Sequence, residues 1–283
     1  EELRAQKEEI ATINEQLEQK VRERTKKLQK AYRDLLNLNY ELDSFIYRAA
    51  HDIRGPITTI MGLCNLALLE KDPNKCHEYL VILDKFSKNT QHTLNRIVSV
   101  NDIKNNPIKP SRFKLSELQN AVLGQLASNP NKNKVIISFD FDPDQTIYSD
   151  FYLLQLIVHN LVDNTIRFRT TDPNITATSN ISIKIEETGY RITVTDNGTG
   201  IEEQIRDKIF DMFFRGSEYS SGSGLGLYIS RIAAKKLGGD IELVSTEPGH
   251  TVFQTFHPFL KEKEKVEVPE KKLIIINSSK SSF

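Results

Sequence analysis

Apolar residues in the first third of the chain recur at the three- and four-residue intervals of an α-helix. The stripe between residues 46 and 68 consists of Ile46, Ala50, Ile53, Ile57, Ile60, Cys64 and Leu68. His51 lies roughly 140° around the helix from the centre of this stripe, so we expect its imidazole to face solvent, with Asp52 beside it. Pro56 has no N–H to give the carbonyl of Asp52, and the pattern therefore predicts a bend at Gly55-Pro56.

The preceding residues, 1–45, predict a coiled coil that runs directly into this helix. The segment is rich in Glu, Lys, Gln and Leu and contains neither Gly nor Pro. Two runs of seven-residue spacing, joined by one four-residue step, are typical of a coiled coil with a stutter. The runs consist of Leu3, Ile10 and Leu17, then Val21, Leu28, Leu35 and Leu42. A single solvated helix is the alternative, because Lys20 and Arg24 fall on or near the seam, but the length of the pattern favours a parallel dimer.

A second helix is predicted after the break at Asp72-Pro73-Asn74, with one apolar face that reaches Asn101. Two helices joined by a short turn form an antiparallel hairpin. A lone hairpin buries little apolar surface, so two chains are expected to pair as a four-helix bundle. We therefore assign residues 46–103 to a dimerisation hairpin and residues 104–112 to a linker.

From about residue 113 the pattern changes to short alternating segments separated by helices. Strands are predicted at 135–141, 181–187, 190–196, 240–245 and 251–256. Helices are predicted at 115–127, 151–168 and 225–237, and an exposed loop at 169–179. This mixture predicts an α+β sandwich over residues 113–260. The charged residues 261–283 predict a flexible tail with a small apolar island at 273–276.

Composition narrows the possible functions. Lys plus Arg number 38 and Asp plus Glu also number 38, which argues against a nucleic-acid-binding protein that relies on a basic surface. The two cysteines, Cys64 and Cys76, form neither a disulfide framework nor a zinc spacing. We find no apolar run long enough for a membrane span and no secretory signal. We therefore expect the cytoplasmic portion of a longer protein, attached to a membrane only through upstream segments.

Two asparagines on the helix predicted at 151–168 are suited to a hard cation. Asn160 and Asn164 are four residues apart and therefore share one face of that helix. Amide oxygens presented in this way suit Mg²⁺, which keeps several waters and bridges to phosphate oxygens. Taken alone, two such asparagines are more often solvated or capping residues, so their meaning depends on what lies beside them.

A glycine-containing turn follows the strand predicted at 190–196. Asp196 ends this strand, and Gly198 and Gly200 allow a tight turn and a close approach of the backbone to a ligand. A carboxylate in this position can accept a hydrogen bond from an exocyclic amine. The same five residues also fit an ordinary turn.

A second glycine-rich segment opens the helix predicted at 225–237. Gly222, Gly224 and Gly226 precede or begin that helix, where free N–H groups and the helix dipole favour phosphate groups. The aromatic segment 209–215 comes shortly before, and predicts either the hinge of a lid or simple core packing.

Together, and in this order, these segments resemble the sensor histidine kinases of two-component signalling. Residues 45–56 are similar to the H box of that family, 156–168 to the N box, 196–200 and 222–227 to the two glycine boxes, and 209–215 to the F box. The resemblance spans about residues 40–258. It implies a dimerisation and phosphotransfer hairpin followed by an ATP-binding domain of the Bergerat type.

The resemblance implies roles for five residues near the phosphates. His51 would be the phospho-acceptor and Asp52 its activating base. Asn160 and Asn164 match the asparagines on the metal and phosphate side, with Asn164 the direct Mg²⁺ ligand. Arg167 stands where Lys is usual in the family, which keeps a positive charge near the phosphates but changes its geometry.

The remaining implied site residues surround the nucleotide. Asp196 would recognise the amino group of adenine, and Gly198 and Gly200 would line the base pocket. The phosphates would lie against Gly222, Gly224 and Gly226. Gly55 departs from the family pattern, which often has a polar residue four positions after the histidine.

The function implied by the resemblance is that of a homodimeric histidine kinase with ATP and Mg²⁺ as cofactors. It would phosphorylate His51 and pass the phosphoryl group to an aspartate of a response-regulator receiver domain, without binding nucleic acid. One alternative is a Bergerat-fold ATPase of the chaperone or topoisomerase kind, which gives no reason for an exposed His51 before Gly55-Pro56. Another is an inactive dimeric scaffold, against which the intact Asn164 and Asp196 argue.

Overall fold

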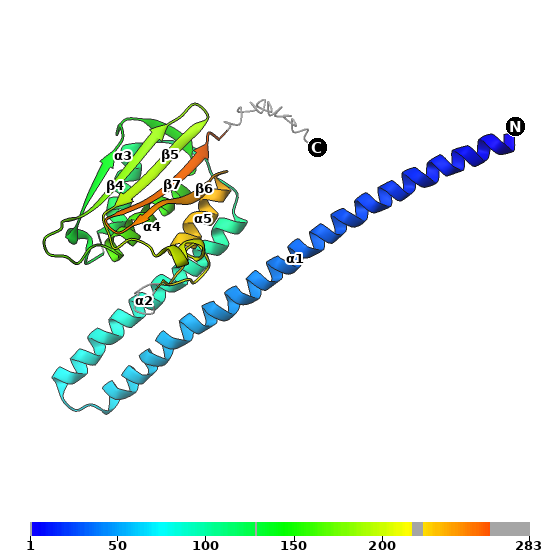
Figure 1. The fold of residues 1–283 in the computed structure, drawn as a ribbon. Helices are drawn as coiled ribbons and strands as arrows, with labels where there is room; N and C mark the ends of the chain where they lie inside the picture. Colours follow the sequence, from blue (N-terminus) through cyan, green and yellow to red (C-terminus); the bar gives the residue numbers. More distant parts are fainter. Residues whose placement is uncertain (1, 128, 217–222, 261–283) are drawn as a thin grey trace, which may run out of the picture.

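The computed structural model describes residues 2–127, 129–216 and 223–260. The predicted tail with its apolar island at 273–276, and the predicted site residue Gly222, lie outside the described residues. Figure 1 shows a long helical hairpin with an α+β unit resting on it. No helix in the described ranges is long and apolar enough to cross a membrane.

Helix α1 (Glu2–Leu69) contains both the predicted coiled-coil segment and the first helix of the hairpin. The helix continues without interruption through Pro56, where a bend was predicted. The hydroxyls of Thr58 and Thr59 donate to the carbonyls of Arg54 and Gly55 and add to the hydrogen bonding of this turn. Proline removes one helical donor at this point, but the packing of α1 on its neighbour spans many turns.

Helix α2 (Pro73–Asn105) returns antiparallel to α1 (Figure 1). Its start is fixed by Asp72, whose carboxylate accepts a hydrogen bond from the N–H of Asn74, and by a proline in the first turn. It ends two residues later than predicted, so the chain between α2 and the first strand is only residues 106–110. One chain leaves several large apolar side chains exposed on the hairpin, among them Ile57, Met61, Leu68, Leu80 and Val98.

The α+β unit is built on a five-stranded sheet of order β2-β4-β5-β7-β6. Its strands are β2 (Val135–Asp140), β4 (Ala177–Ile185), β5 (Gly189–Asp196), β6 (Asp240–Glu247) and β7 (His250–Pro258). The pair β2–β4 is parallel and the other pairs are antiparallel. All five strands were predicted, although β4 begins inside the predicted loop at 169–179. Its first residues are Ala, Thr and Ser, which give no apolar alternation to detect.

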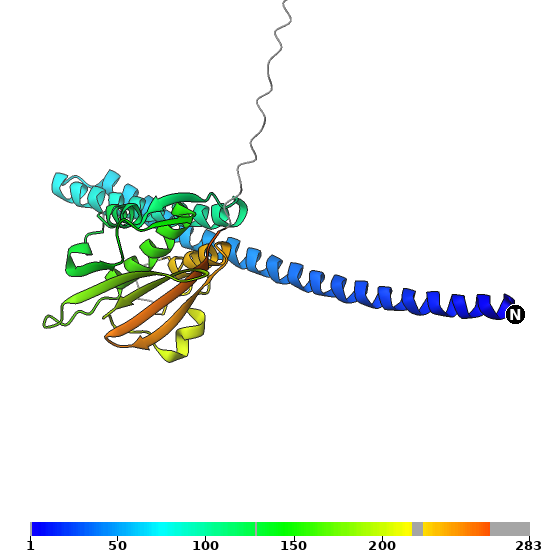
Figure 2. The same ribbon diagram turned by 90° about the horizontal axis from the view of Figure 1, so that it is seen from above.

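Three α-helices accompany the sheet: α3 (Leu115–Leu126), α4 (Phe151–Arg167) and α5 (Gly226–Lys236). Helices α4 and α5 lie between the sheet and the hairpin, as Figure 2 shows from above. Short 3-10 helices occupy Lys132–Lys134 and Glu203–Lys208. The predictions of all three α-helices are confirmed to within a residue or two.

A small second sheet was not predicted from the sequence. Strand β1 (Ser111–Lys114) pairs antiparallel with β3 (Thr146–Ser149). Each strand has four residues, which is too short for a convincing period-two pattern. The sheet closes one end of the core, because Phe113 and Ile147 are both buried.

The core of the α+β unit contains one fully buried histidine. His257 lies on β7, and its Nε2 is 3.0 Å from the hydroxyl oxygen of Thr255, whereas its Nδ1 has no hydrogen-bond partner. Burial lowers the pKa of His257 to about 4. The folded protein therefore keeps this imidazole neutral well below the pH at which an unfolded chain protonates it.

This histidine predicts a loss of stability in mild acid. Between about pH 6.5 and pH 4 the unfolded chain binds a proton at His257 that the folded chain does not, so the free energy of unfolding falls as the pH falls, by about 3 kcal/mol in total. Urea unfolding of the parent and of His257→Leu between pH 4.5 and 7.5 measures this. The variant should show a flatter pH dependence, and replacement of the exposed His77 by Gln should leave the slope unchanged. Equal slopes in the parent and in His257→Leu would contradict the assignment.

Candidate active site

A cavity of about 280 Å³ opens between α4, the end of β5, the segment after β5 and the start of α5. Six of the residues predicted from the sequence line it: Asn164, Arg167, Asp196, Gly200, Gly224 and Gly226. Apolar side chains, including Ile201, Ile209 and Phe253, form much of the wall. A planar ligand with a charged end suits such a mixture.

The first glycine turn places a buried carboxylate in this cavity. Asp196 is the last residue of β5, and its carboxylate accepts hydrogen bonds from the N–H of Gly198 at 2.9 Å and from the hydroxyl of Thr165 at 3.3 Å. Burial raises the pKa of the Asp196 carboxyl, and these hydrogen bonds, with one from Thr251, oppose that rise. Gly198, which was expected to line the base pocket, is not among the residues that line the cavity, and its N–H instead orients the carboxylate of Asp196.

Two glycines of the cavity have left-handed backbone conformations. Gly200 has φ +78°, and a Cβ there would lie 2.8 Å from the nitrogen of Pro248. Gly224 has φ +65°, and a Cβ there would lie 2.6 Å from the carbonyl carbon of Phe213. Both positions therefore need glycine for two reasons, the backbone conformation and the close approach of a neighbouring segment.

The two asparagines of α4 lie beside the first residue of α5. The Oδ1 atoms of Asn160 and Asn164 would each lie 3.9 Å from a Cβ built on Gly226. Asn164 lines the cavity, whereas Asn160 is buried next to it. The described residues contain no group of three His, Cys, Asp or Glu side chains that could hold a metal. One amide oxygen that leaves most coordination positions to water and phosphate suits Mg²⁺.

The start of α5 offers further unfilled donors. Residue Leu225 precedes the helix without a side-chain cap, so the first N–H groups of α5 have no capping partner from that side chain. The hydroxyl of Ser223 lines the cavity, is buried and has no hydrogen-bond partner within the described residues. These donors and the helix dipole fit the negatively charged end of a nucleotide.

His51 lies on α1, exposed as predicted, with 74% of its side chain accessible. Its Nδ1 is 3.3 Å from Oδ1 of Asp52. The other carboxylate oxygen of Asp52 accepts a hydrogen bond from Arg215 at 3.4 Å, and Arg215 also lines the cavity. The rim of the cavity therefore reaches the residue next to His51 in the same chain.

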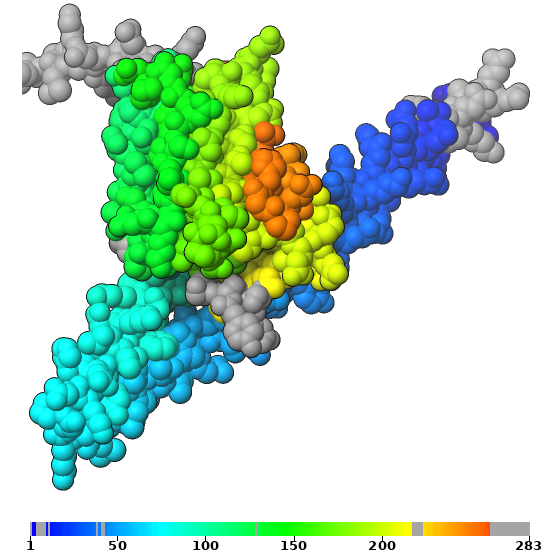
Figure 3. Space-filling model, turned by 60° about the vertical axis from the view of Figure 1, so that its left-hand side comes forward, coloured from blue at the N-terminus to red at the C-terminus, as the bar shows by residue number. Residues whose placement is uncertain are grey.

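The predicted F box explains this contact, because the segment 209–215 is docked on α1. The guanidinium of Arg48 donates to the carbonyl of Met212 at 2.9 Å, and the rings of Phe45 and Phe213 lie 6.2 Å apart. Figure 3 shows the α+β unit seated on the hairpin, with the yellow surface of this region toward α1. Phe210 instead packs into the core against Phe253, so the segment both anchors in the core and contacts the hairpin.

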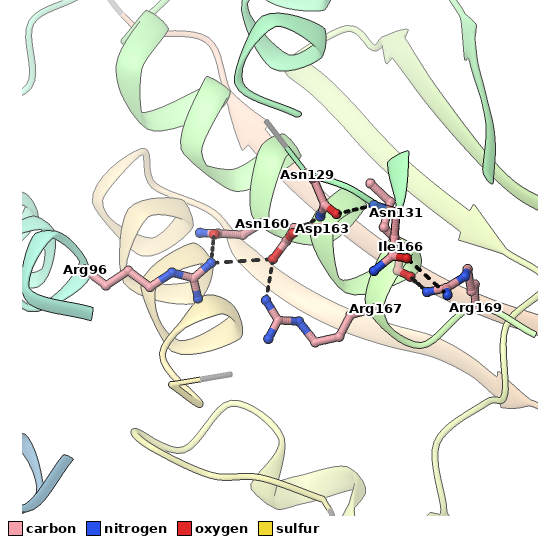
Figure 4. A network of polar contacts seen from close by, with 8 residues as sticks. All are labelled: Arg96, Asn129, Asn131, Asn160, Asp163, Ile166, Arg167 and Arg169. Carbon is pink, nitrogen blue, oxygen red and sulfur yellow. Dashed lines mark hydrogen bonds and ion pairs between the residues drawn. The ribbon is translucent and has the colours of Figure 1, made fainter. Parts of the chain in front are cut away.

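A network of polar contacts joins α2 to α4 at the same end of the cavity (Figure 4). Arg96 of α2 donates to Oδ1 of Asn160 at 3.3 Å and lies 3.7 Å from Asp163. Arg167 donates to Asp163 at 2.8 Å. Burial acts to raise the pKa of Asp163, but the two guanidinium groups outweigh it and hold the pKa below its ordinary value. Sequence reasoning found Arg167 and missed Arg48, Arg96 and Arg215, whose partners lie 64 to 164 residues away along the chain.

Comparison with protein families places this cavity in a known domain. Residues 149–261 match the family model described as histidine kinase-, DNA gyrase B-, and HSP90-like ATPase. The matched range begins just before α4 and ends just after β7, and it contains the Asn, Asp and glycine positions predicted for the nucleotide.

Curated relatives extend the similarity into the helical hairpin. The chain is 26% identical over 233 residues to a histidine kinase of Formosa agariphila, which covers 76% of this chain and 16% of that protein. It is 26% identical to the aerobic respiration control sensor protein ArcB of Escherichia coli, over 81% of this chain and 30% of that protein. It is 29% identical to the sensory histidine kinase/phosphatase NtrB of Vibrio alginolyticus, over 75% of this chain and 61% of that protein. The chain thus spans less than a third of the first two relatives.

Solved structures show the same fold. The histidine kinase AdeS of Acinetobacter baumannii superposes with a TM-score of 0.60 at 18% identity, over 75% of this chain and 98% of that chain. ThkA, crystallised in complex with the response regulator protein TrrA, gives 0.58 at 24% identity, over 75% and 60%. ShkA, crystallised in complex with AMPPNP, gives 0.55 at 19% identity, over 78% and 46%. The helical region followed by an α+β unit is therefore a shared architecture.

The family model alone would also fit gyrase- or HSP90-like ATPases, but the three curated relatives are histidine kinases and sensors whose similarity includes the hairpin. The resemblance inferred from the ordered motifs is thereby confirmed: residues 149–261 match the histidine kinase-, DNA gyrase B-, and HSP90-like ATPase family, and the chain as a whole is similar to sensor histidine kinases.

Proposed function

We propose that this chain is a histidine kinase that transfers the terminal phosphoryl group of Mg-ATP to His51 and then to an aspartate of a response-regulator receiver domain. The observation that carries this proposal is the position of Arg215. It lines the cavity that contains Asn164 and Asp196, and it also contacts Asp52 beside His51. A nucleotide site and an exposed nucleophile are thus bridged by one side chain.

Different residues of the cavity bind the adenine, the phosphates and the metal ion of the nucleotide. The carboxylate of Asp196 accepts a hydrogen bond from the exocyclic amine of adenine, and Gly200 leaves room for the base beside it. The first N–H groups of α5, with Gly224 and Gly226, face the phosphates. Asn164 offers its amide oxygen to Mg²⁺, which when bound neutralises charge on the phosphate oxygens.

Asp52 prepares His51 for attack. Its carboxylate lies next to Nδ1 of His51, which favours the tautomer with a proton on Nδ1 and a lone pair on Nε2. The lone pair forms the N–P bond while the bond from phosphorus to the bridging oxygen of ADP breaks, and the proton on the imidazole passes to Asp52 or to water. Arg215 holds Asp52 and adds a positive charge on the cavity side.

Partners and assembly are part of the same proposal. The complex of ThkA with TrrA supports a receiver domain as the acceptor, and the AMPPNP complex of ShkA supports ATP as the donor. The exposed apolar residues of the hairpin support pairing of two chains as a four-helix bundle. Residues 1–45 would then form a signalling coiled coil, 46–103 the phosphotransfer hairpin and 113–260 the catalytic domain, in the cytoplasmic portion of a longer sensor.

Replacement of the phospho-acceptor should separate phosphorylation from nucleotide binding. Incubation of the parent with γ-labelled ATP should give a label that is lost in acid and retained in alkali, as expected for a phosphoramidate. His51→Gln should carry no label and should still bind ATP, because the cavity does not include His51. His77→Gln is the matched control and should be labelled like the parent. A label that survives acid, or one that persists in His51→Gln, would contradict the assignment of His51 as the phospho-acceptor.

Replacement of the cavity residues should affect the two ends of the nucleotide differently. Asn164→Ala should abolish the Mg²⁺ dependence of ATP binding measured by calorimetry. Asp196→Asn should weaken both ATP and adenosine by roughly tenfold or more, because a buried hydrogen bond to a charged group is worth about 1.5–3 kcal/mol. Asn65→Ala, on the exposed surface of α1, should change neither. Unchanged Mg-ATP affinity in both site variants would place the nucleotide elsewhere.

Gly55 predicts weak phosphatase activity toward the phosphorylated receiver domain. It lies four residues after His51 on the same helix face, where a polar side chain could orient the attacking water. Loss of one such hydrogen bond would slow hydrolysis by about a hundredfold. A Cβ at Gly55 would meet nothing within 4 Å, so Gly55→Thr fits without strain. The variant should dephosphorylate the receiver faster than the parent, whereas rapid hydrolysis by both the parent and Gly55→Ala would show that another group holds the water.

A further inference from the structure

Arg96 belongs to helix α2 of the hairpin, yet its guanidinium reaches the cavity of the α+β unit. It lines the cavity, and only 13% of its side chain is exposed. A Cβ built on Gly226, the first residue of α5, would lie 3.2 Å from its Nη1. The guanidinium therefore lies between α4 and the start of α5, beside the site expected for phosphate.

The charges at this point do not balance. Arg96 and Arg167 both pair with Asp163, and no other ion pair of either arginine occurs in the described part of the chain. Burial lowers the pKa of Arg96, Arg167 acts in the same direction, and Asp163 only partly offsets them. One carboxylate thus faces two guanidinium groups, both of which line the cavity. An anion in the cavity would compensate the excess positive charge.

Unfilled donors point in the same direction. The amide nitrogen of Asn160 is buried without a partner, while its oxygen already accepts a hydrogen bond from Arg96. The hydroxyl of Ser223 is also buried and unpartnered, and it lines the cavity. Buried donors of this kind are usually satisfied, so the Ser223 hydroxyl in the cavity, and the Asn160 amide next to Arg96, indicate that a ligand acceptor completes this end of the cavity. Phosphate oxygens are acceptors of the right charge.

We propose that Arg96 completes the phosphate end of the nucleotide site from the hairpin, so that the site is shared between the hairpin and the α+β unit. The proposal rests on the proposed function only in taking ATP as the ligand. A triphosphate would contact Arg96 directly, and its binding would therefore favour the docked arrangement.

The docked arrangement has other contacts that such coupling would strengthen. Lys236 of α5 donates to the carbonyls of Ile103 and Asn106 at the end of α2. Arg48 and Phe45 hold the segment 209–215 on α1 at the other side of the cavity. Among the described residues, Arg96 is the one from the hairpin that lines the cavity.

The alternative is that Arg96 blocks the site, because its guanidinium already binds the amide oxygen of Asn160, which is the atom that a metal ion would need. The two possibilities predict opposite changes in affinity. If Arg96 binds phosphate, its removal weakens ATP; if it blocks the site, its removal strengthens ATP. The charge excess favours the first, since a second cation beside Arg167 gains nothing without an anion.

Calorimetry and ligand-observed NMR on the full chain test the proposal with ATP and adenosine. Arg96→Ala should weaken Mg-ATP by about tenfold or more and leave adenosine within twofold of the parent, because adenosine has no phosphate. Arg96→Lys should lose less, since it keeps the charge. Lys88→Ala, an exposed change on α2, should change neither ligand. If the parent itself fails to bind Mg-ATP, the proposed function fails; if the parent binds and Arg96→Ala binds ATP equally or more tightly, the role of Arg96 is wrong.

A second readout separates a ligand contact from a structural role. Hydrogen exchange of the segment 209–214, which is docked on α1, should slow when the parent is saturated with Mg-ATP. At equal occupancy, Arg96→Ala should show less of this protection, whereas adenosine should give none in either protein. Equal weakening of ATP and adenosine, or equal protection in the parent and the variant, would show that Arg96 only supports the fold.

Discussion

The amphipathicity of α4 is the constraint on which the rest of the structure depends. One face of this helix is buried in the core through Leu154, Ile157 and Leu161. Beside this apolar face, Asn164 and Arg167 line the cavity, and Asn160 and Asp163 contact Arg96 of the hairpin. Asp150 fixes the start of α4 by accepting a hydrogen bond from the N–H of Leu153, and it also holds the end of the linker through the N–H of Lys109. Core packing thereby sets the position of the chemistry.

Ion pairs then connect the hairpin to the α+β unit on both sides of α4. Arg96 of α2 forms an ion pair with Asp163 of α4, and Arg215 at the cavity forms one with Asp52 of α1. Exposed ion pairs contribute little to stability. The pair between Arg96 and Asp163 is largely buried, so loss of either partner would leave the other charge buried and unpaired. A ligand that adds negative charge between these arginines changes the balance for both. The hairpin also packs on the α+β unit through apolar side chains, with Val100 and Ile103 of α2 buried in the shared core, so the charges at Arg96 and Arg215 add to an apolar contact.

Much of the fold could be predicted from periodicity, because long amphipathic helices and five alternating strands each repeat a signal over many residues. The order of the motifs also predicted that Asn164, Asp196, Gly200, Gly224 and Gly226 line one cavity. The strands β1 and β3 were missed because four residues carry too little pattern. Arg48, Arg96 and Arg215 were missed because their roles depend on how the α+β unit docks on the hairpin, and no local sequence signal encodes that. The role of Asn160 at the ligand stays a prediction; its amide oxygen accepts a hydrogen bond from Arg96.

The most direct test of this account is a crystal structure of the chain with Mg²⁺ and a non-hydrolysable ATP analogue. We expect adenine at Asp196, the metal at Asn164, and the terminal phosphates between the start of α5 and the guanidinium of Arg96, with the hairpin still docked. A nucleotide bound outside this cavity, or one bound within it while Arg96 remains on Asn160 and Asp163 without contact to phosphate, would contradict it.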